Sequence, residues 1–229
     1  MRAPDSRGFW DDAARGDAYW HIATGSSGDP AEFYASGAAE TDALLADCGI
    51  VPSEGRAVLE IGCGAGRMTW RLSELFGQVI ALDVSAEMLR HARRALAGRG
   101  NITFLHGNGS DLSGLADQSV DVVFSYITMQ HVPTGAGQLS YVRETARVLR
   151  PGGQAALQFR ANGVLPVALD LAGHVAHAVQ GRRTFRREWR GARVPAGELL
   201  AAARGRGAAA RLVRRGARHL WLLITAPTP

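Results

Sequence analysis

The residues best suited to chemistry are three glycines and two acids around one turn. The segment VLEIGCGAGRM, residues 58–68, runs from apolar residues through Glu60 into a glycine-rich stretch. The glycines are Gly62, Gly64 and Gly66. A second acid, Asp83, ends the later apolar segment VIALD. Glycines let a backbone approach a ligand closely, and ligands of open α/β sheets bind beyond the carboxyl end of a strand at such a turn.

The spacing of the glycines and the acid before them narrow the choice of ligand. The dinucleotide fingerprint is GxGxxG, whereas this chain has GxGxG, with Arg67 at the place of the last glycine. Glu60 would repel a pyrophosphate but attract an ammonium group. The methionyl part of S-adenosylmethionine (SAM) carries an α-amino group, so Glu60 favours SAM. Asp83 can accept both ribose hydroxyls of any adenosine-bearing ligand.

A third polar stretch, HGNGSDL, follows another strand-like segment. Asn108 could present its amide to the edge of an adenine, and Gly109 would let the backbone approach the ring. A plain turn would use the same residue types, so both interpretations stay open.

Five segments, taken in order, resemble the motifs of class I SAM-dependent methyltransferases, most closely the small-molecule type common in GC-rich bacteria. They are EIGCGAGR, LDVSAEML, GNGSDL, SVDVVFSYITMQHVP and YVRETARVLRPGG, within residues 58–159. The resemblance implies SAM as cofactor and S-adenosylhomocysteine as product. It implies a cofactor site made of Glu60, Gly62, Cys63, Gly64, Gly66, Asp83, Val84, Met88, Asn108, Gly109, Ser125 and Tyr126. Members of the family often carry Asp where Asn108 stands.

The candidate for catalysis is His131, in MQHVP after the fourth predicted strand. It would accept a proton from the methyl acceptor or only shape the pocket. Alignment of the reacting atoms alone can lower the barrier by ~7–11 kcal/mol, so a base is optional. We expect the methyl acceptor to contact the aromatic N-terminus, this turn and the region after the fifth strand. The expected residues are Tyr19, Trp20, Tyr34, Gln130, His131, Arg160 and Trp189.

The elements that must position these residues alternate between strand and helix from residue 56 onward, which predicts an α/β fold. Strands are predicted at 57–62, 78–83, 102–107, 120–127, 154–159, 209–215 and 219–226. Helices are predicted at 68–76, 86–96, 138–149, 165–179 and 195–205, with Ser85 capping the second. We expect a Rossmann-like, seven-stranded, mostly parallel sheet with helices on both faces, its last strand antiparallel, and an N-terminal helical cap.

One domain is expected over residues 1–229. Its parts would be an N-terminal cap (1–55), a SAM-binding core (56–160), a substrate-covering insertion (161–193) and a closing helix with a strand hairpin (194–229). The N-terminus lacks an apolar stretch typical of a signal peptide, and the late apolar run LWLLITAP is too short to span a bilayer. We therefore expect a cytoplasmic location and no membrane partner.

Composition excludes several chemistries. All 26 basic residues are Arg, so a lysine Schiff base and a P-loop lysine are excluded. Cys48 and Cys63 are the only cysteines, which excludes a disulfide framework. We expect no metal site, although His174 and His177 have a helical spacing. The stretch from Arg182 to Arg218 holds twelve Arg and two acids; it suits a solvated face, an acidic substrate or a nucleic acid.

The leading hypothesis is methyl transfer from SAM to an O or N atom of a small organic molecule in bacterial specialised metabolism. The acceptor would be aromatic or anionic, and the protein a monomer or homodimer. Nucleic-acid, above all RNA, methylation is the first alternative, but no Asp/Asn-Pro-Pro-aromatic element follows the fourth strand and no RNA-binding module is recognisable. The second is a SAM-binding cyclase or scaffold that transfers no methyl group.

Overall fold

The computed structural model describes residues 6–23, 29–161, 191–215 and 218–229. The predicted helix at 165–179, Trp189, and the pair His174 and His177 lie outside the described residues. Within the described part, no helix combines the length and the apolarity needed to cross a bilayer.

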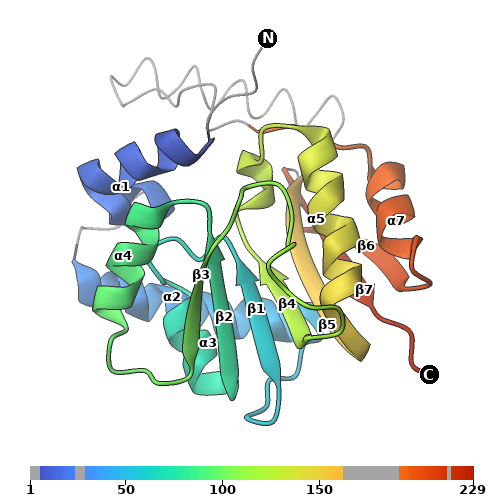
Figure 1. The fold of residues 1–229 in the computed structure, drawn as a ribbon, viewed down its shortest axis with the longest axis horizontal. Helices are drawn as coiled ribbons and strands as arrows, with labels where there is room; N and C mark the ends of the chain where they lie inside the picture. The colour runs from blue at the N-terminus through green and yellow to red at the C-terminus, as the bar shows by residue number, and fades with distance from the viewer. Residues whose placement is uncertain (1–5, 24–28, 162–190, 216–217) are drawn as a thin grey trace.

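A seven-stranded sheet forms the centre of the molecule (Figure 1). The strands are β1 (Ala57–Ile61), β2 (Gln78–Asp83), β3 (Ile102–His106), β4 (Val120–Ser125), β5 (Leu149–Arg160), β6 (Ala209–Arg215) and β7 (His219–Thr225). Their order is β3-β2-β1-β4-β5-β7-β6. β1 to β5 run parallel, and β7 is antiparallel to both β5 and β6. The predicted seven-stranded sheet with its antiparallel last strand is confirmed.

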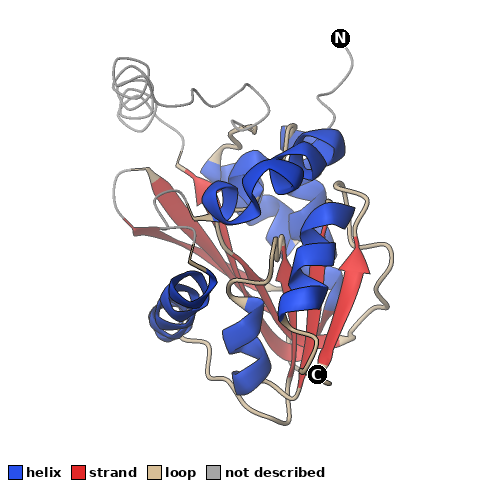
Figure 2. Ribbon diagram, turned by 90° about the vertical axis from the view of Figure 1, so that its left-hand side faces the viewer, coloured by secondary structure: helices blue, strands red, loops and turns tan. Residues whose placement is uncertain are grey.

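Helices cover both faces of this sheet, as the view in Figure 2 shows. They are α1 (Ser6–Ile22), α2 (Pro30–Cys48), α3 (Thr69–Leu75), α4 (Ala86–Ala95), the 3-10 turn η1 (Met129–His131), α5 (Gly135–Val148) and α7 (Ala196–Arg204). α5 and α7 pack together, while α2 packs on α3 and α1 on α4. The two-sided arrangement follows from strands that are apolar on both faces, as parallel sheets require.

The core alternates strictly along the strands. In β4, Val123 joins the cluster beneath α5 and α7, whereas Val122 and Phe124 join the cluster beneath α2 and α3. β7 repeats the pattern, with Leu222 on the first side and Trp221 on the second. Side chains of a strand point to opposite faces with period 2, so one buried strand supplies both cores.

The N-terminal residues form the expected helical cap. α1 lies against α4, next to the sheet (Figure 1). Asp11 fastens the two helices, because its Oδ1 accepts hydrogen bonds from Ser85 Oγ at 2.6 Å and from the Glu87 amide at 3.2 Å. Ser85 itself caps α4 by accepting from the Met88 amide at 3.1 Å, as predicted. Two side chains therefore accept from amides in the first turn of α4: Asp11 of α1 and Ser85 of the core.

The fifth strand is longer than predicted. The sequence pattern predicts that Pro151, Gly152 and Gly153 separate the preceding helix from the strand, yet β5 begins at Leu149 and includes them. A register shift opposite Val120 and Val122 accommodates the extra residues as an irregularity of the β4–β5 pair. The C-terminal segment supports this part of the strand, since the Ala226 amide donates to the Gly153 carbonyl at 2.9 Å.

Candidate active site

A cavity of about 130 Å³ opens beyond the carboxyl ends of β1, β2 and β4. That is roughly ten times the space one water molecule needs, so the cavity can take a small molecule. Ten of the predicted site residues line it: Glu60, Gly62, Cys63, Gly64, Asp83, Val84, Met88, Gly109, Tyr126 and His131. The strand order reverses its direction between β1 and β4. Ligands of open α/β sheets bind beyond the carboxyl ends of the strands at such a point, and the cavity lies there.

The glycine loop forms the floor of the cavity. Gly62 and Gly64 have φ angles of +80° and +53°, in the left-handed region that L side chains rarely adopt. A Cβ on Gly62 would lie 2.2 Å from the side chain of Thr128, and one on Gly64 would lie 2.8 Å from Ile22. The loop therefore needs glycine both for its backbone conformation and for the close approach of two other segments.

Asp83, at the end of β2, organises this loop. Its Oδ2 accepts from the Gly64 amide at 2.8 Å, and its Oδ1 accepts from the Ser85 amide at 2.8 Å. Burial raises the pKa of its carboxyl group, while these amides oppose the rise. Each carboxylate oxygen has a second lone pair. The side chain can thus hold the loop and still accept hydrogen bonds from a ribose.

Glu60 is a buried acid in the cavity wall, 4% exposed. Thr69 Oγ1 donates to its Oε2 at 2.6 Å. Burial raises the pKa of Glu60 from 4.5 to about 7, and nearby Asp83 adds to the rise. Burial disfavours the ionised form of Glu60, and a positive charge close to the carboxylate would favour it. An ammonium group bound in the cavity would therefore interact strongly with ionised Glu60.

The turn after β4 closes the cavity from the side. Ile127 has φ +56°, a strained conformation for a β-branched residue. It sets the Thr128 side chain against Gly62 of the glycine loop. Within the turn, Thr128 Oγ1 donates to the Tyr126 carbonyl at 3.1 Å. Tyr126 donates to Glu40 at 2.6 Å and stacks on Trp221, with ring centroids 6.0 Å apart. Backbone strain at a ligand cavity is a common sign of a functional site.

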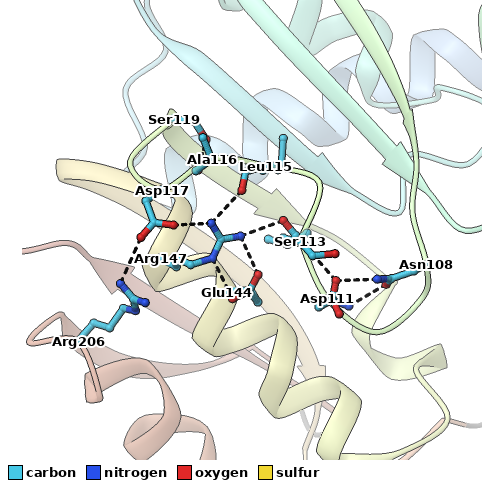
Figure 3. Close-up of polar contacts among 11 residues, drawn as sticks. Asn108, Asp111, Ser113, Leu115, Ala116, Asp117, Ser119, Glu144, Arg147 and Arg206 are labelled. Atoms are coloured by element: carbon cyan, nitrogen blue, oxygen red, sulfur yellow. Dashed lines mark hydrogen bonds and ion pairs between the residues drawn. The ribbon is translucent and has the colours of Figure 1, made fainter.

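The loop between β3 and β4 contributes Gly109 to the wall. Figure 3 shows how the base of this loop is tied to α5. Arg147 donates to the carbonyls of Leu112 at 2.9 Å and Leu115 at 2.8 Å, and it pairs with Asp117 at 2.7 Å. One guanidinium thus fixes three points of a loop that has no regular structure of its own.

Asn108 makes its hydrogen bonds within its own turn. Its Oδ1 accepts from the Ser110 amide at 2.8 Å and the Asp111 amide at 3.0 Å, and its Nδ2 donates to Asp111 Oδ1 at 2.6 Å (Figure 3). The side chain is outside the cavity wall. Its amide is engaged in a turn of the Asx type, the plainer of the two interpretations of HGNGSDL.

His131 lies on η1 and is 8% exposed. Its ring meets Trp10 of α1 edge to face, with centroids 5.2 Å apart. Gln138 of α5 holds the turn in place, because its Nε2 donates to the carbonyls of Met129 and Ala192, both at 2.9 Å. The imidazole is therefore set between the cap helix and the sheet edge, at one end of the cavity.

The remaining predicted residues lie behind the wall or outside it. Ser125 donates to the Ile61 carbonyl at 3.0 Å and so joins β4 to β1. Tyr34 donates to the Ala65 carbonyl at 2.9 Å, and Tyr19 packs on Phe33. The predicted residues that do not line the cavity are Gly66, Asn108, Ser125, Tyr19, Trp20, Tyr34, Gln130 and Arg160. Ser125, Gln130 and Gly66 make hydrogen bonds to residues that do line it, namely Ile61, His131 and Cys63.

Sequence reasoning missed several wall residues. Helix α1 supplies Trp10, His21 and Ile22. The turn after β4 supplies Thr128, and α5 supplies Tyr141. The aromatic N-terminus was a signal, but it did not show which aromatic residue faces the cavity. A kink at Asp17 separates Trp10 from His21 and Ile22, and both parts of α1 contribute residues to the wall.

The two ends of the cavity suit two kinds of chemistry. One end fits the amino-acid and ribose parts of SAM. Glu60 can bind the ammonium group, and Asp83 beside the glycine loop can accept from the ribose. Trp10, His131 and neighbouring apolar residues form an end that can take a flat or apolar group. When bound, SAM supplies a methyl group on a positively charged sulfur.

Comparison with known families agrees with this geometry. Residues 59–157 match the family model described as a methyltransferase domain. That range holds most of β1, all of β2 to β4, η1 and α5, and most of β5, together with the glycine loop and His131. It therefore contains the wall of the cavity apart from the residues of α1.

Two relatives of this chain are methyltransferases by name. The chain is 38% identical over 99 residues to a probable S-adenosylmethionine-dependent methyltransferase of Mycolicibacterium smegmatis, which covers 43% of this chain and 36% of that protein. It is 32% identical over 130 residues to the tRNA 5-carboxymethoxyuridine methyltransferase of Escherichia coli K12, covering 55% and 48%. The chain thus spans between about a third and a half of the length of these relatives.

The fold agrees with a solved structure of the same class. Phosphoethanolamine N-methyltransferase 1 of Haemonchus contortus, in complex with phosphoethanolamine and S-adenosylhomocysteine, superposes with a TM-score of 0.71 at 19% identity, over 100% of this chain and 50% of that one. Together with the order of the seven-stranded sheet, this likeness shows the fold of the chain. Residues 59–157 of the chain match a methyltransferase domain, and the fold is that of the class I SAM-dependent methyltransferases.

Proposed function

We propose that this protein transfers a methyl group from SAM to an O or N atom of a small organic molecule. The observation that carries the proposal is the division of one cavity into a polar end and an apolar, aromatic end. The polar end holds the buried Glu60 and Asp83; the other end is closed by Trp10 of α1. A closed pocket with few polar groups is typical of small-molecule sites.

The roles of the chain's own residues follow from their contacts. The ionised form of Glu60 would bind the α-ammonium group of SAM, and Asp83 would accept from its ribose. The glycine loop, held by Asp83, lets the backbone come close to the ligand. Trp10 and Ile22 cover the cavity and exclude water. Alignment of nucleophile, methyl carbon and sulfur can lower the barrier by ~7–11 kcal/mol, so positioning is the main contribution we assign to these residues.

An aromatic acceptor suits the apolar end, where Trp10, Pro133 and Tyr141 line the wall. Offset or edge-to-face contacts with such rings contribute roughly 0.5–1.5 kcal/mol each beyond the buried area. The N-terminal cap (1–55) and the segment 161–193 would enclose this acceptor over the SAM-binding core (56–160). We propose that the acceptor reaches the cavity past His131.

Methylation of RNA is the second candidate. The relative from Escherichia coli acts, by its name, on a modified uridine of tRNA. In this chain β6 exposes Arg211 and Arg214, and α7 is followed by Arg206. These guanidinium groups could contact phosphates, but they lie on β6 and after α7, and none of them lines the cavity.

One assay separates the candidates. Wild-type protein is incubated with methyl-labelled SAM and either a panel of small aromatic hydroxyl, amine and carboxylate compounds or total tRNA. We expect label transfer to a small molecule and none to tRNA. Labelled tRNA, or tRNA binding that weakens steeply with salt, would replace the proposal with RNA methylation. SAM binding without S-adenosylhomocysteine production on any acceptor would favour a scaffold or cyclase.

The Asp83→Asn variant tests the assignment of the cofactor site. It keeps the size of the side chain but removes the charge that accepts two backbone amides. We expect S-adenosylhomocysteine to bind at least tenfold more weakly, about 1.4 kcal/mol. Asp42→Asn, a surface acid paired with Arg71, should bind like wild type.

A further inference from the structure

A chain of hydrogen bonds runs from His131 in the cavity wall to the far strand β7. Gln130 Nε2 lies 3.1 Å from His131 Nε2. On its other side, Gln130 Oε1 lies 3.1 Å from Nε2 of His219. One amide therefore stands between two imidazoles that are 88 residues apart in the sequence.

With the Gln130 amide in this orientation, the protons of both ring nitrogens follow from its donor and acceptor atoms. An amide nitrogen only donates, so Nε2 of His131 must accept and cannot hold a proton. A neutral imidazole has one proton, which then resides on Nδ1 of His131. An amide oxygen only accepts, so Nε2 of His219 must carry a proton.

The fold holds the three side chains in this order. Gln130 and His131 are consecutive residues of η1, whose carbonyls are fixed by Gln138. His219 is the first residue of β7. Because β7 is antiparallel, its first residue lies at the same edge of the sheet as the last residue of β5, Arg160, with which it is paired. The antiparallel strand thus brings an imidazole to the edge where parallel strands end.

Gly191 packs the other side of the turn closely. A Cβ there would lie 2.5 Å from the carbonyl oxygens of Gln130 and Val132. The Ala192 amide also donates to the Val132 carbonyl at 2.9 Å. The backbone of η1 is therefore held from both sides, and this keeps the Gln130 side chain between the two histidines.

We propose that Gln130 and His219 are positioning residues that hold His131 as a neutral imidazole protonated on Nδ1. In this state the lone pair of Nε2 is occupied by the Gln130 amide. His131 then carries its proton on Nδ1, and its Nε2 is not available as a base. The cavity would suit an acceptor atom that arrives with a lone pair already exposed, such as a carboxylate oxygen or a neutral amine.

The inference rests on the proposed function for its meaning, but its test needs no turnover. Protein labelled with ¹⁵N is examined by NMR spectra that correlate ring nitrogens with ring protons and so report the tautomer of each histidine. His131→Gln and His219→Gln identify the two sets of signals. We expect His131 to be neutral and protonated on Nδ1 in the wild-type protein.

Three variants then test the role of the chain. His219→Leu and Gln130→Met remove a donor or the amide, and His131 should shift to a mixture of both tautomers. His219→Gln keeps an N–H near the position of Nε2, so the His131 signals should stay as in the wild type. Gln154→Met, at the amino end of β5 and bonded to the Gly49 carbonyl, is the matched control and should change nothing.

Two results would overturn the inference: His131 protonated on Nε2 in the wild type, or unchanged His131 signals in both His219→Leu and Gln130→Met. Calorimetry with S-adenosylhomocysteine checks that each variant is folded. If His219→Leu is not folded, the His131 signals of Gln130→Met alone decide the test. If no protein binds S-adenosylhomocysteine but the tautomer is as expected, the proposed function fails and this inference stands.

Discussion

The two ends of the cavity are built in different ways. The polar end comes from residues 60–69 and 83–88, in segments joined by adjacent parallel strands. The opposite end combines Trp10 of α1 with His131 of η1, which are far apart in the sequence. Contacts at the polar end run mainly through the backbone, whereas the other end depends on side chains of separate helices. The polar end should therefore respond to single substitutions more sharply than the other end.

This contrast has a physical cause. In the glycine loop, Asp83 accepts from two amides, and the conformation requires positive φ angles. Such a backbone has no alternative arrangement at low cost. At the opposite end, Trp10 meets the His131 ring edge to face, a contact that neighbouring side chains can partly replace on truncation. Cofactor binding should be rigidly specified, and acceptor choice should be easier to change.

Gly62→Ala should produce the largest effect. The new Cβ would lie 2.2 Å from Thr128 in a backbone with φ +80°. Left-handed strain and overpacking each cost about 1–3 kcal/mol. We expect a loss of roughly 2–5 kcal/mol in urea unfolding and an S-adenosylhomocysteine affinity too weak to measure by calorimetry.

Gly98→Ala is the control for this substitution, because a Cβ at Gly98 would meet no other atom within 4 Å and its φ is not positive. It should be as stable as wild type or slightly more so. Equal stability of the two variants would show that the glycine loop is not rigidly specified.

Glu60→Gln should separate stability from binding. Its pKa of about 7 in the folded protein exceeds the ordinary 4.5, so ionisation costs stability as pH rises through this interval, and the cost is complete above about pH 7. At pH 8 the variant should therefore be more stable, by up to about 3 kcal/mol. It should nevertheless bind S-adenosylhomocysteine at least tenfold more weakly, or about 1.4 kcal/mol.

Thermal unfolding and calorimetry at pH 8 measure both quantities. Glu87→Gln, which removes a partly exposed acid paired with Arg90, is the control and should change neither by much. A Glu60→Gln variant that is less stable and binds normally would contradict the assignment of Glu60 to the ammonium group.

The affinity of the wild-type protein should depend on pH through the same group. Only ionised Glu60 attracts an ammonium group, and with a pKa of about 7 its ionised fraction falls about tenfold between pH 8 and pH 6. Affinity for S-adenosylhomocysteine should fall by a similar factor as pH is lowered. Calorimetry at the two pH values tests this, and Glu60→Gln should show a much weaker dependence.

Asp11→Ala should have the smallest effect, because it loosens only the attachment of the cap. Asp11 accepts from Ser85 Oγ and the Glu87 amide at the start of α4. Loss of such a cap contact costs about 1 kcal/mol. We expect a small drop in the midpoint of urea unfolding and a loss of S-adenosylhomocysteine affinity of less than about fivefold.

Asp12→Ala, one residue away and paired only with exposed Arg15 in α1, provides the comparison. It should match wild type in both measurements. If Asp11→Ala weakened binding as much as Glu60→Gln, the two ends of the cavity would be equally rigid and the contrast between them would be wrong.

The sequence by itself determined the sheet, its strand count, and the polar end of the cavity. Alternation of apolar segments predicts the strands, and the glycines, Glu60 and Asp83 follow directly from short motifs. These features are local: a left-handed turn and a capped helix depend on neighbours a few residues away. Ser85 at the start of α4 is an example that was predicted and confirmed.

The tertiary structure alone decided the opposite end and the details of hydrogen bonding. No periodicity shows that Trp10 meets His131, that Asn108 folds into its own turn, or that His219 reaches Gln130. These contacts join segments far apart in the chain or depend on the direction of one side chain. Their geometry is set by the packing of helices and by an antiparallel strand, which short sequence patterns do not encode.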